Sequence, residues 1–170
     1  ISTDKLGGAN LHDFHAFTPT VANIRPTSRG EITIISNDTK VNPKIKMNYL
    51  STDEDRKVAA DGIKLIRKIV METNEFKKYE PEEFRPGSHL NDKEEIVKAC
   101  SHYAQTIFHP VGTCKMGNDE SAVVSDKLKV HGINKLRVID ASIMPNITSG
   151  NTNAPTIMIA EKGADMILSA

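Results

Sequence analysis

The sequence lacks the features that mark several common classes of protein. Its 22 basic and 22 acidic residues give a formal net charge of zero, so no excess of positive charge favours binding to nucleic acid. No apolar run approaches the ~20 residues that a membrane span needs, and no secretory signal is recognised. We therefore expect no nucleic-acid partner, and a location in the cytoplasm or at the periphery of the inner membrane.

Cysteine is scarce as well. The two cysteines, Cys100 and Cys114, form no Cys-x-x-Cys pair, so neither a disulfide scaffold nor a zinc site is expected. His12 and His15 flank Asp13, but they would face opposite sides of a strand, and no third ligand lies near them in the sequence. We predict that the chain holds no metal.

The chain does not begin with methionine, and the residues from Ile1 onward show no targeting pattern. We interpret it as a piece of a longer protein whose N-terminal part is missing. Its 170 residues are enough for one ordinary domain with a hydrophobic core, but they are few for an enzyme that binds a large cofactor.

The N-terminal half predicts an antiparallel sheet and a long helix. Strands are expected at residues 12–24, 31–35 and 44–50, and the short turns between them favour antiparallel neighbours. A helix is predicted from about 53 to 73, with Ser51 and Glu54 as a capping box. Its apolar residues recur at helical spacing: Val58, Gly62, Leu65, Ile66, Ile69 and Val70.

The rest of the chain predicts fewer regular elements. After a loop at 75–90, a second helix is expected from about 92 to 104, capped by Asn91 or Asp92. Short strands at 128–130 and 136–139 precede a final helix at 155–168, with Pro155 in its first turn. The fold class is therefore α+β, an antiparallel sheet backed by helices in residues 1–105 and a strand–helix segment in residues 106–170.

Two polar residues are candidates for catalysis. His109 lies in the loop Phe-His-Pro-Val-Gly-Thr-Cys-Lys-Met-Gly of residues 108–117, where an imidazole near glycine can take a proton from a small substrate. Asn151, in Ser-Gly-Asn-Thr-Asn-Ala-Pro-Thr of residues 149–156, can hydrogen-bond a substrate oxygen. Each alone has a simpler interpretation, since loop histidines are commonly incidental and asparagine is frequent in turns.

The order of three motifs is far more specific than either residue. Residues 108–117, the run Leu-Arg-Val-Ile-Asp-Ala-Ser-Ile-Met-Pro at 136–145, and residues 149–156 together resemble the C-terminal part of the glucose–methanol–choline (GMC) flavoprotein oxidoreductases. The resemblance is to the choline-dehydrogenase-like alcohol dehydrogenases in particular. Arg-Pro-Thr-Ser-Arg-Gly at residues 25–30 matches the same family, so the resemblance covers nearly the whole chain.

The resemblance implies FAD-dependent oxidation of an alcohol, with loss of the hydroxyl proton and transfer of a hydride to flavin N5. His109 falls at the family's active-site histidine, and Asn151 falls where members carry a second histidine or an asparagine. Cofactor contacts are implied for two groups of residues. Asp140 and Ala141 fall near the ribityl or phosphate region of FAD, and Asn153, Ala154 and Pro155 near the pyrimidine end of the flavin.

One part of the family's machinery is absent from the sequence. Family members bind the ADP half of FAD with a Gly-x-Gly-x-x-Gly turn near the N-terminus, and no such spacing occurs here. The resemblance therefore implies that this chain holds the substrate-binding sheet, and that residues 106–170 return to an FAD domain whose Rossmann part is missing. We expect the chain alone to bind FAD weakly or not at all and to have no turnover.

Other interpretations stay open at this point. The chain could be a non-catalytic binding or interaction module that keeps the architecture, or a thiol-dependent hydrolase using Cys114 and His109, although the resemblance makes Cys114 a packing residue. The alcohol is open between choline, other alcohols and sugars, and the electron acceptor between a quinone, another carrier and oxygen. Exposed apolar surface on such a piece would favour self-association.

Overall fold

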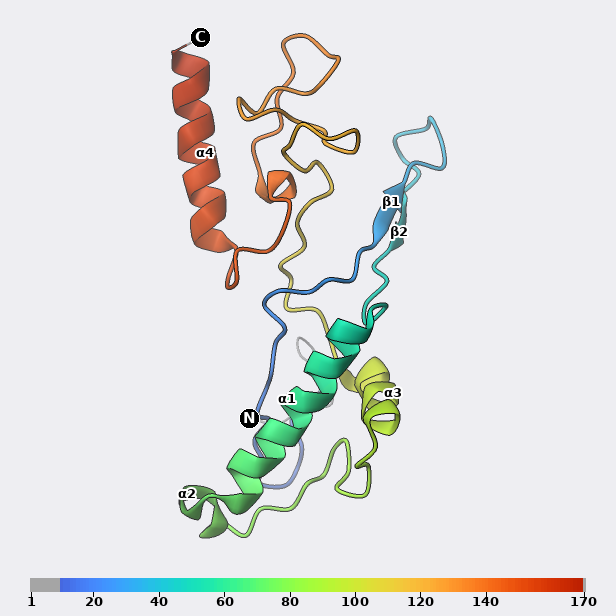
Figure 1. Ribbon diagram of the computed structural model, residues 1–170, viewed down its shortest axis with the longest axis vertical. Helices are drawn as coiled ribbons and strands as arrows, with labels where there is room; N and C mark the ends of the chain where they lie inside the picture. Colours follow the sequence, from blue (N-terminus) through green and yellow to red (C-terminus); the bar gives the residue numbers. More distant parts are fainter. Residues whose placement is uncertain (1–9, 170) are drawn as a thin grey trace. The chain divides into compact units, whose positions relative to one another are not determined.

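The structure, a computed structural model, describes residues 10–169, which form two compact units. The first unit contains residues 10–23, 27–29 and 48–107, and the second contains residues 24–26, 30–47 and 108–169. Within the described residues, two short antiparallel strands occur together with several helices (Figure 1). The predicted α+β class is confirmed. No helix in this range is long and apolar enough to cross a membrane.

The first unit is built around helix α1. Helices α1 (Asp53–Glu72), α2 (Asn74–Lys77) and α3 (Lys93–Tyr103) follow one another, and α1 packs against both of the others (Figure 1). The small core consists of three buried residues, Ala60, Ile96 and Val97, and the partly buried Ile63, Leu90 and Cys100. Burial raises the pKa of the Cys100 thiol, because it disfavours the charged thiolate.

The buried face of α1 differs from the predicted stripe. Of the predicted residues, Gly62 is buried and Ile66 and Val70 are half-buried, whereas Leu65 and Ile69 are 55% and 44% exposed. Ala60, which was not predicted, is buried. The helix makes its close contacts through small residues: a Cβ at Gly62 would lie 2.7 Å from Cγ1 of Val21. Small side chains allow the segment before α1 and helix α3 to approach the backbone, and this shifts the buried face away from the larger apolar residues.

The helix starts also refine the predictions. The N-cap of α1 is Thr52 rather than Ser51, because Thr52 is the last extended residue and its Oγ1 accepts from the Asp55 amide at 3.3 Å. Ser51 instead donates its backbone N–H to Ser28 Oγ. Of the two candidate caps for α3, Asp92 is confirmed, since its carboxylate accepts from the Glu94 amide at 2.8 Å.

Residues 12–24 form no strand, and that prediction was wrong. The segment is irregular and its apolar side chains pack on helices, with Val21 against Gly62 and the ring of Phe17 stacked on Phe76 at 5.6 Å between centroids. Pro19 has no N–H to donate to a ladder. Part of this Phe- and Val-rich segment therefore packs against helices α1 and α2, and the rings of His12, Phe14 and Phe84 contact one another outside helices.

The predicted three-stranded sheet is a two-stranded one. Strand β1 (Glu31–Thr33) pairs antiparallel with β2 (Lys44–Lys46), and Ile32 lies opposite Ile45 (Figure 1). Gly30 is required at the start of β1, because a Cβ there would lie 2.7 Å from the carbonyl oxygen of Met47. Strand β2 ends before Asn48, whose φ of 55° leaves the extended region, so the strand predicted at 44–50 is shorter.

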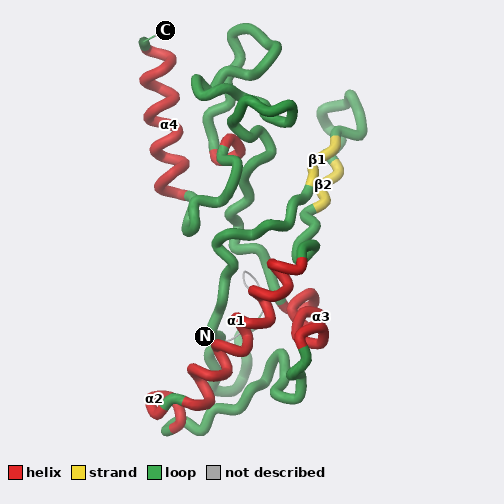
Figure 2. The backbone as a smooth tube through the Cα atoms, viewed as in Figure 1, coloured by secondary structure: helices red, strands yellow, loops and turns green. Residues whose placement is uncertain are grey.

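The second unit is mostly loop, with one long helix. Figure 2 shows that residues 108–152 contain only a single turn of helix, η1 (Ala141–Ile143), before α4 (Asn153–Leu168). The strands predicted at 128–130 and 136–139 are isolated bridges, Val124 with Val130 and Lys129 with Arg137. Left-handed backbone at Leu128 and Lys135, with φ of 60° and 63°, interrupts the ladders.

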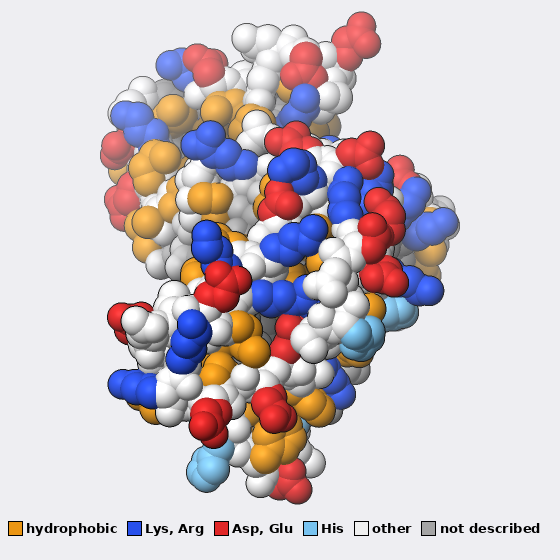
Figure 3. Space-filling model, turned by 60° about the horizontal axis from the view of Figure 1, so that its bottom comes forward, with side chains coloured by type: hydrophobic (Ala, Val, Ile, Leu, Met, Phe, Trp, Pro, Cys, Tyr) orange, Lys and Arg blue, Asp and Glu red, His pale blue; other side chains and the backbone are white. Residues whose placement is uncertain are grey.

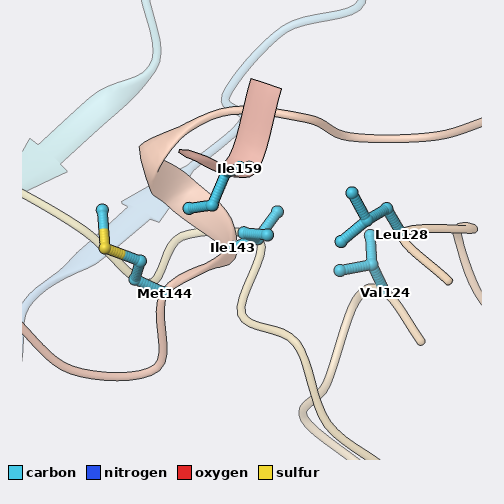
Figure 4. Packing of buried hydrophobic residues seen from close by; sticks show 5 residues of the cluster. All are labelled: Val124, Leu128, Ile143, Met144 and Ile159. Carbon is cyan, nitrogen blue, oxygen red and sulfur yellow. The ribbon is translucent and has the colours of Figure 1, made fainter. Parts of the chain in front are cut away.

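The core of the second unit joins η1 to α4. Ile143 of η1 and Ile159 of α4 point toward each other, beside Val124, Leu128 and Met144 (Figure 4). Helix α4 begins two residues earlier than predicted, and Pro155 lies in its first turn as expected. Its buried Gly163 faces Ile139, whose Cδ1 would lie 2.9 Å from a Cβ at that position. This core fixes the two segments that flank the candidate site.

Candidate functional site

His109 lies half-buried in a loop that is tied to η1 by backbone hydrogen bonds. The Cys114 amide donates to the Ser142 carbonyl at 3.1 Å, and the Met116 amide donates to the Ile143 carbonyl at 2.8 Å. Gly112 has a φ of 89°, and a Cβ there would lie 3.4 Å from the Met144 carbonyl oxygen. Glycine therefore permits the sharp turn that brings this loop onto η1.

The residue before His109 has an unusual backbone. Phe108 has a φ of 62°, in the left-handed region that a bulky residue seldom adopts, and its side chain is 74% exposed. Strained backbone of this kind is frequent next to functional groups in proteins. The backbone that leads into His109 therefore has a conformation that phenylalanine seldom adopts.

Asp140 and Ala141 lie at the start of η1. Oδ1 of Asp140 accepts from the Ser142 amide at 2.8 Å and also from the Ser142 hydroxyl, which caps the short helix. The Asp140 side chain is exposed and Ala141 is half-buried. Asp140 is therefore a capping residue of η1, and its contact with FAD stays a prediction.

Asn151 lies in the exposed loop between η1 and α4. It follows Ser149, whose φ is 61°, and Gly150, where a Cβ would have no atom within 4 Å. Thr152 is the N-cap of α4, but its side chain makes no capping hydrogen bond.

The first turn of α4 presents backbone N–H groups without acidic side chains beside them. Asn153 and Ala154 are exposed, Pro155 is half-buried and has no N–H, and no acidic residue occurs in this turn. The first amides of a helix have no partner within the helix, and the helix dipole favours negative charge there. The arrangement suits an anionic or carbonyl group of a ligand.

The structure brings these candidate residues into one unit. The His109 loop is hydrogen-bonded to η1, η1 packs on α4, and the loop with Asn151 joins η1 to α4. Direct participation of His109 and Asn151 in binding one substrate stays a prediction. For the metal hypothesis, residues 10–169 contain no group of three or more His, Cys, Asp or Glu side chains arranged to hold an ion. His12 instead stacks on Phe14, with ring centroids 4.9 Å apart.

Two polar contacts were not anticipated from the sequence. Arg25 Nε donates to Ser149 Oγ at 2.8 Å in the second unit. In the first unit, Asp55 is buried at 4% exposure and accepts from the amides of Thr27 and Ser28 at 2.9 and 2.8 Å. The motif at residues 25–30 indicated a segment that resembles the family, but it did not identify Ser149 or Asp55 as the residues that this segment contacts.

The ionisation of Asp55 reflects these contacts. Burial raises the pKa of the carboxyl, but hydrogen bonds from Ser28 and Thr27 outweigh it, and the net effect is a pKa below the usual value. Asn23 Nδ2 also donates to Oδ1 at 3.1 Å. Asp55 is thus a charged structural group that fastens the segment before β1 to the start of α1.

Comparison with known proteins places these motifs in a family. The family model described as GMC oxidoreductase matches residues 26–160. An oxygen-dependent choline dehydrogenase of Proteus mirabilis (strain HI4320) is 47% identical over 160 residues, which are 94% of this chain and 29% of that protein. The chain therefore spans less than a third of the length of this relative.

Solved structures of oxidoreductases are also similar to this chain. Pyridoxine 4-oxidase from Mesorbium loti is similar with a TM-score of 0.79 and 33% identity, over 86% of this chain and 28% of the other. An FAD-dependent oxidoreductase from Chaetomium thermophilum has a TM-score of 0.80 and 30% identity, over 86% of this chain and 25% of the other. The predicted family is confirmed: the chain belongs to the GMC oxidoreductases.

Proposed function

We propose that this chain is the C-terminal part of an FAD-dependent enzyme that oxidises an alcohol, and that His109 and Asn151 act on the hydroxyl group. The observation that carries the proposal is the hydrogen-bonded assembly of the His109 loop, η1 and the start of α4 in a chain of this family. The identity of 47% to a choline dehydrogenase supports oxidation at a CH–OH group, with choline as the first substrate to test.

His109 receives the hydroxyl proton in this proposal. Its half-buried imidazole lies in a loop fixed by backbone hydrogen bonds, which is the preorganisation that general-base catalysis needs. The Asn151 amide hydrogen-bonds the same oxygen and stabilises the negative charge that develops as the proton leaves. FAD, when bound, supplies the acceptor for the hydride from the carbinol carbon.

The residues at the start of α4 fit a flavin. The uncapped amides of Asn153 and Ala154 and the absence of acidic residues in the first turn suit the electron-rich pyrimidine edge of the ring. Asp140 and Ala141 are the further candidates to contact FAD, near its ribityl or phosphate groups. These residues would orient the cofactor, while its ADP half is bound by the Rossmann part that we propose lies elsewhere in the whole protein.

Binding and activity are therefore expected of the whole flavoprotein and not of this chain by itself. Since the chain has no Gly-x-Gly-x-x-Gly turn, we expect it to retain no flavin after gel filtration. The name of the Proteus mirabilis relative makes oxygen the first electron acceptor to test, before a quinone or another carrier.

An absorbance spectrum tests whether FAD binding requires the N-terminal part of the protein. The chain alone is incubated with excess FAD and freed of unbound cofactor, and the same is done after co-expression with an N-terminal FAD-binding part. We expect a flavin band only in the second sample, followed by anaerobic bleaching with choline or another alcohol. A flavin band in the chain alone would contradict the proposal that FAD binding needs the N-terminal part.

The catalytic residues are tested in that second sample. His109→Ala is expected to slow flavin reduction by roughly 100-fold or more, and Asn151→Ala by a smaller factor, because general-base removal costs more than loss of a neutral hydrogen bond. Cys114→Ser is the matched control, and it should leave reduction unchanged if no thiol chemistry is used. Unchanged reduction in His109→Ala would refute the assignment of His109 as the base.

A further inference from the structure

Arg25 and Ser149 form a hydrogen bond that the proposed chemistry does not use. Arg25 Nε donates to Ser149 Oγ at 2.8 Å, across 124 positions of the sequence. Both residues belong to the second unit, which also contains His109, η1 and α4. A bond from a charged donor is stronger than one between neutral groups, so this contact is suited to hold a loop in place.

The loop that receives this bond has a demanding conformation. Ser149 has a φ of 61°, which residues other than glycine adopt at an energetic cost. A Cβ on the following Gly150 would have no atom within 4 Å, so side-chain packing does little to fix the turn. The left-handed turn therefore depends on polar contacts, and Arg25 provides one directly on the strained residue.

The position of Asn151 follows from the conformation of Ser149. Asn151 is two residues further along the chain and directly precedes the N-cap Thr152. The Thr152 side chain makes no capping hydrogen bond, and its carbonyl accepts from the amide and the hydroxyl of Thr156 at 3.0 and 2.6 Å. A change of φ at Ser149 would swing the Asn151 amide and reorient the entrance to α4. The backbone at Ser149 thus controls where the Asn151 side chain lies.

We propose that Arg25 is a positioning residue for Asn151, which it holds in place through the left-handed turn at Ser149. The proposal rests on the proposed function, because the reaction gives Asn151 its role. Arg25 touches neither the substrate nor the flavin in this mechanism, and it acts through Ser149.

The test uses the whole flavoprotein with Arg25→Ala, Ser149→Ala and the double variant. Misplacing a catalytic group by about 1 Å can lower a rate by roughly 100-fold, and we expect Arg25→Ala to slow flavin reduction by roughly 10-fold to 100-fold. Ser149→Ala should have a similar effect, and the double variant should be no slower than Arg25→Ala. We expect KM to change by less than about twofold, because the substrate pocket itself is intact.

Two further variants sharpen the test. Arg25→Lys keeps a positive donor but loses the planar guanidinium, so it should restore part of the rate. Lys127→Ala, which removes an exposed cation of the same unit, should have no effect. Hydrogen exchange at the amides of Gly150, Asn151 and Thr152 should be faster in Arg25→Ala than in the parent protein.

Other outcomes would overturn the proposal. If Arg25→Ala is slow while Ser149→Ala is normal, or if the two effects multiply, Arg25 acts by another route, such as direct contact with an anionic ligand. An Arg25→Ala protein with normal reduction kinetics would also refute it. If none of the alcohols tested reduces the flavin of the parent protein, the proposed function fails. Hydrogen exchange at residues 150–152 then still decides whether Arg25 holds the turn.

Discussion

The Asp55 carboxylate lies 2.8 Å from the backbone nitrogen of Ser28, which donates to Oδ2, and the Thr27 amide donates to Oδ1 at 2.9 Å. One buried side chain thus satisfies two backbone donors 27 and 28 positions away, and its own charge is stabilised by them. A buried donor that loses its acceptor costs more free energy than the hydrogen bond contributes in net terms. Asp55 should therefore be among the most sensitive positions of the first unit.

Replacing Asp55 should destabilise the first unit strongly. Asp55→Ala leaves the Thr27 and Ser28 amides without their acceptor, and we expect a loss of about 2–4 kcal/mol in the free energy of unfolding. Urea unfolding followed by circular dichroism measures the change. Glu54→Ala, on the exposed side of the same helical turn, is the matched control and should stay close to the parent protein. Equal stability of Asp55→Ala and the parent would show that these bonds contribute little.

The same carboxylate predicts a pH dependence. Because the folded pKa of Asp55 is lowered relative to the unfolded chain, its contribution is fully present above the unfolded pKa of about 3.9 and is lost as the pH falls through the folded value. The difference in urea midpoint between the parent and Asp55→Asn should therefore shrink from pH 6 to pH 3. A difference that stayed constant over this range would contradict a lowered pKa.

Close packing of α4 predicts a penalty for adding a methyl group at Gly163. A Cβ there would lie 2.9 Å from Cδ1 of Ile139, and overpacking costs about 1–3 kcal/mol, whereas alanine gains up to about 1 kcal/mol in helix propensity. We expect Gly163→Ala to lower the free energy of unfolding by about 1 kcal/mol overall. Ala164→Gly, at an exposed position of the same helix, measures the propensity effect separately.

A double-mutant cycle identifies the cause. Ile139→Ala removes the atoms that Gly163→Ala would meet, so Ile139→Ala should cost less in the Gly163→Ala background than in the parent. Additive effects of the two substitutions would mean that the helix simply shifts away from Ile139.

The sequence predicted the helices well and the contacts between distant segments poorly. Helical spacing and side-chain caps placed α1, α3 and α4 within two residues at each end, because these signals are local. The strand predicted at 12–24 was wrong because phenylalanine and valine are frequent in strands and also in irregular segments that pack against helices. The link from Arg25 to Ser149 spans 124 positions and has no local signal. The ordered motifs of the family made His109 and Asn151 candidates, which stay a prediction, and the structure adds the backbone conformation around them.

The mostly buried ion pair between Arg67 of α1 and Glu83 should contribute more to stability than exposed ion pairs on α1. Arg67 donates from Nε and Nη2 to both oxygens of Glu83 at 2.9 Å, and its Nη1 donates to the Leu90 carbonyl. The two side chains are only 17% and 11% exposed. Arg67→Met leaves the largely buried Glu83 carboxylate without its partner, and we expect the free energy of unfolding to fall by about 2–4 kcal/mol. Lys57→Met, which breaks the exposed pair with Asp61 on α1, should cause no measurable change in the urea midpoint.

Apolar side chains on the strand pair predict that the chain alone associates with itself. Ile32 of β1 lies opposite Ile45 of β2, and Ile34 follows the end of β1; the three side chains are 50%, 59% and 84% exposed, respectively. Exposed apolar surface of this kind favours association. On the face of the molecule shown in Figure 3, basic and acidic side chains are interspersed, with hydrophobic side chains at the surface between them.

We expect sedimentation to give a mass above 18.7 kDa that rises with concentration, and Ile34→Lys with Ile45→Lys to lower it toward the monomer. Thr33→Lys, on the opposite face of β1, adds a charge without removing apolar surface and should leave association unchanged. A parent chain that stays monomeric at every concentration would show that this face does not bind a second copy. If Thr33→Lys dissociates the complex as well as the isoleucine variants do, net charge controls association rather than the apolar face.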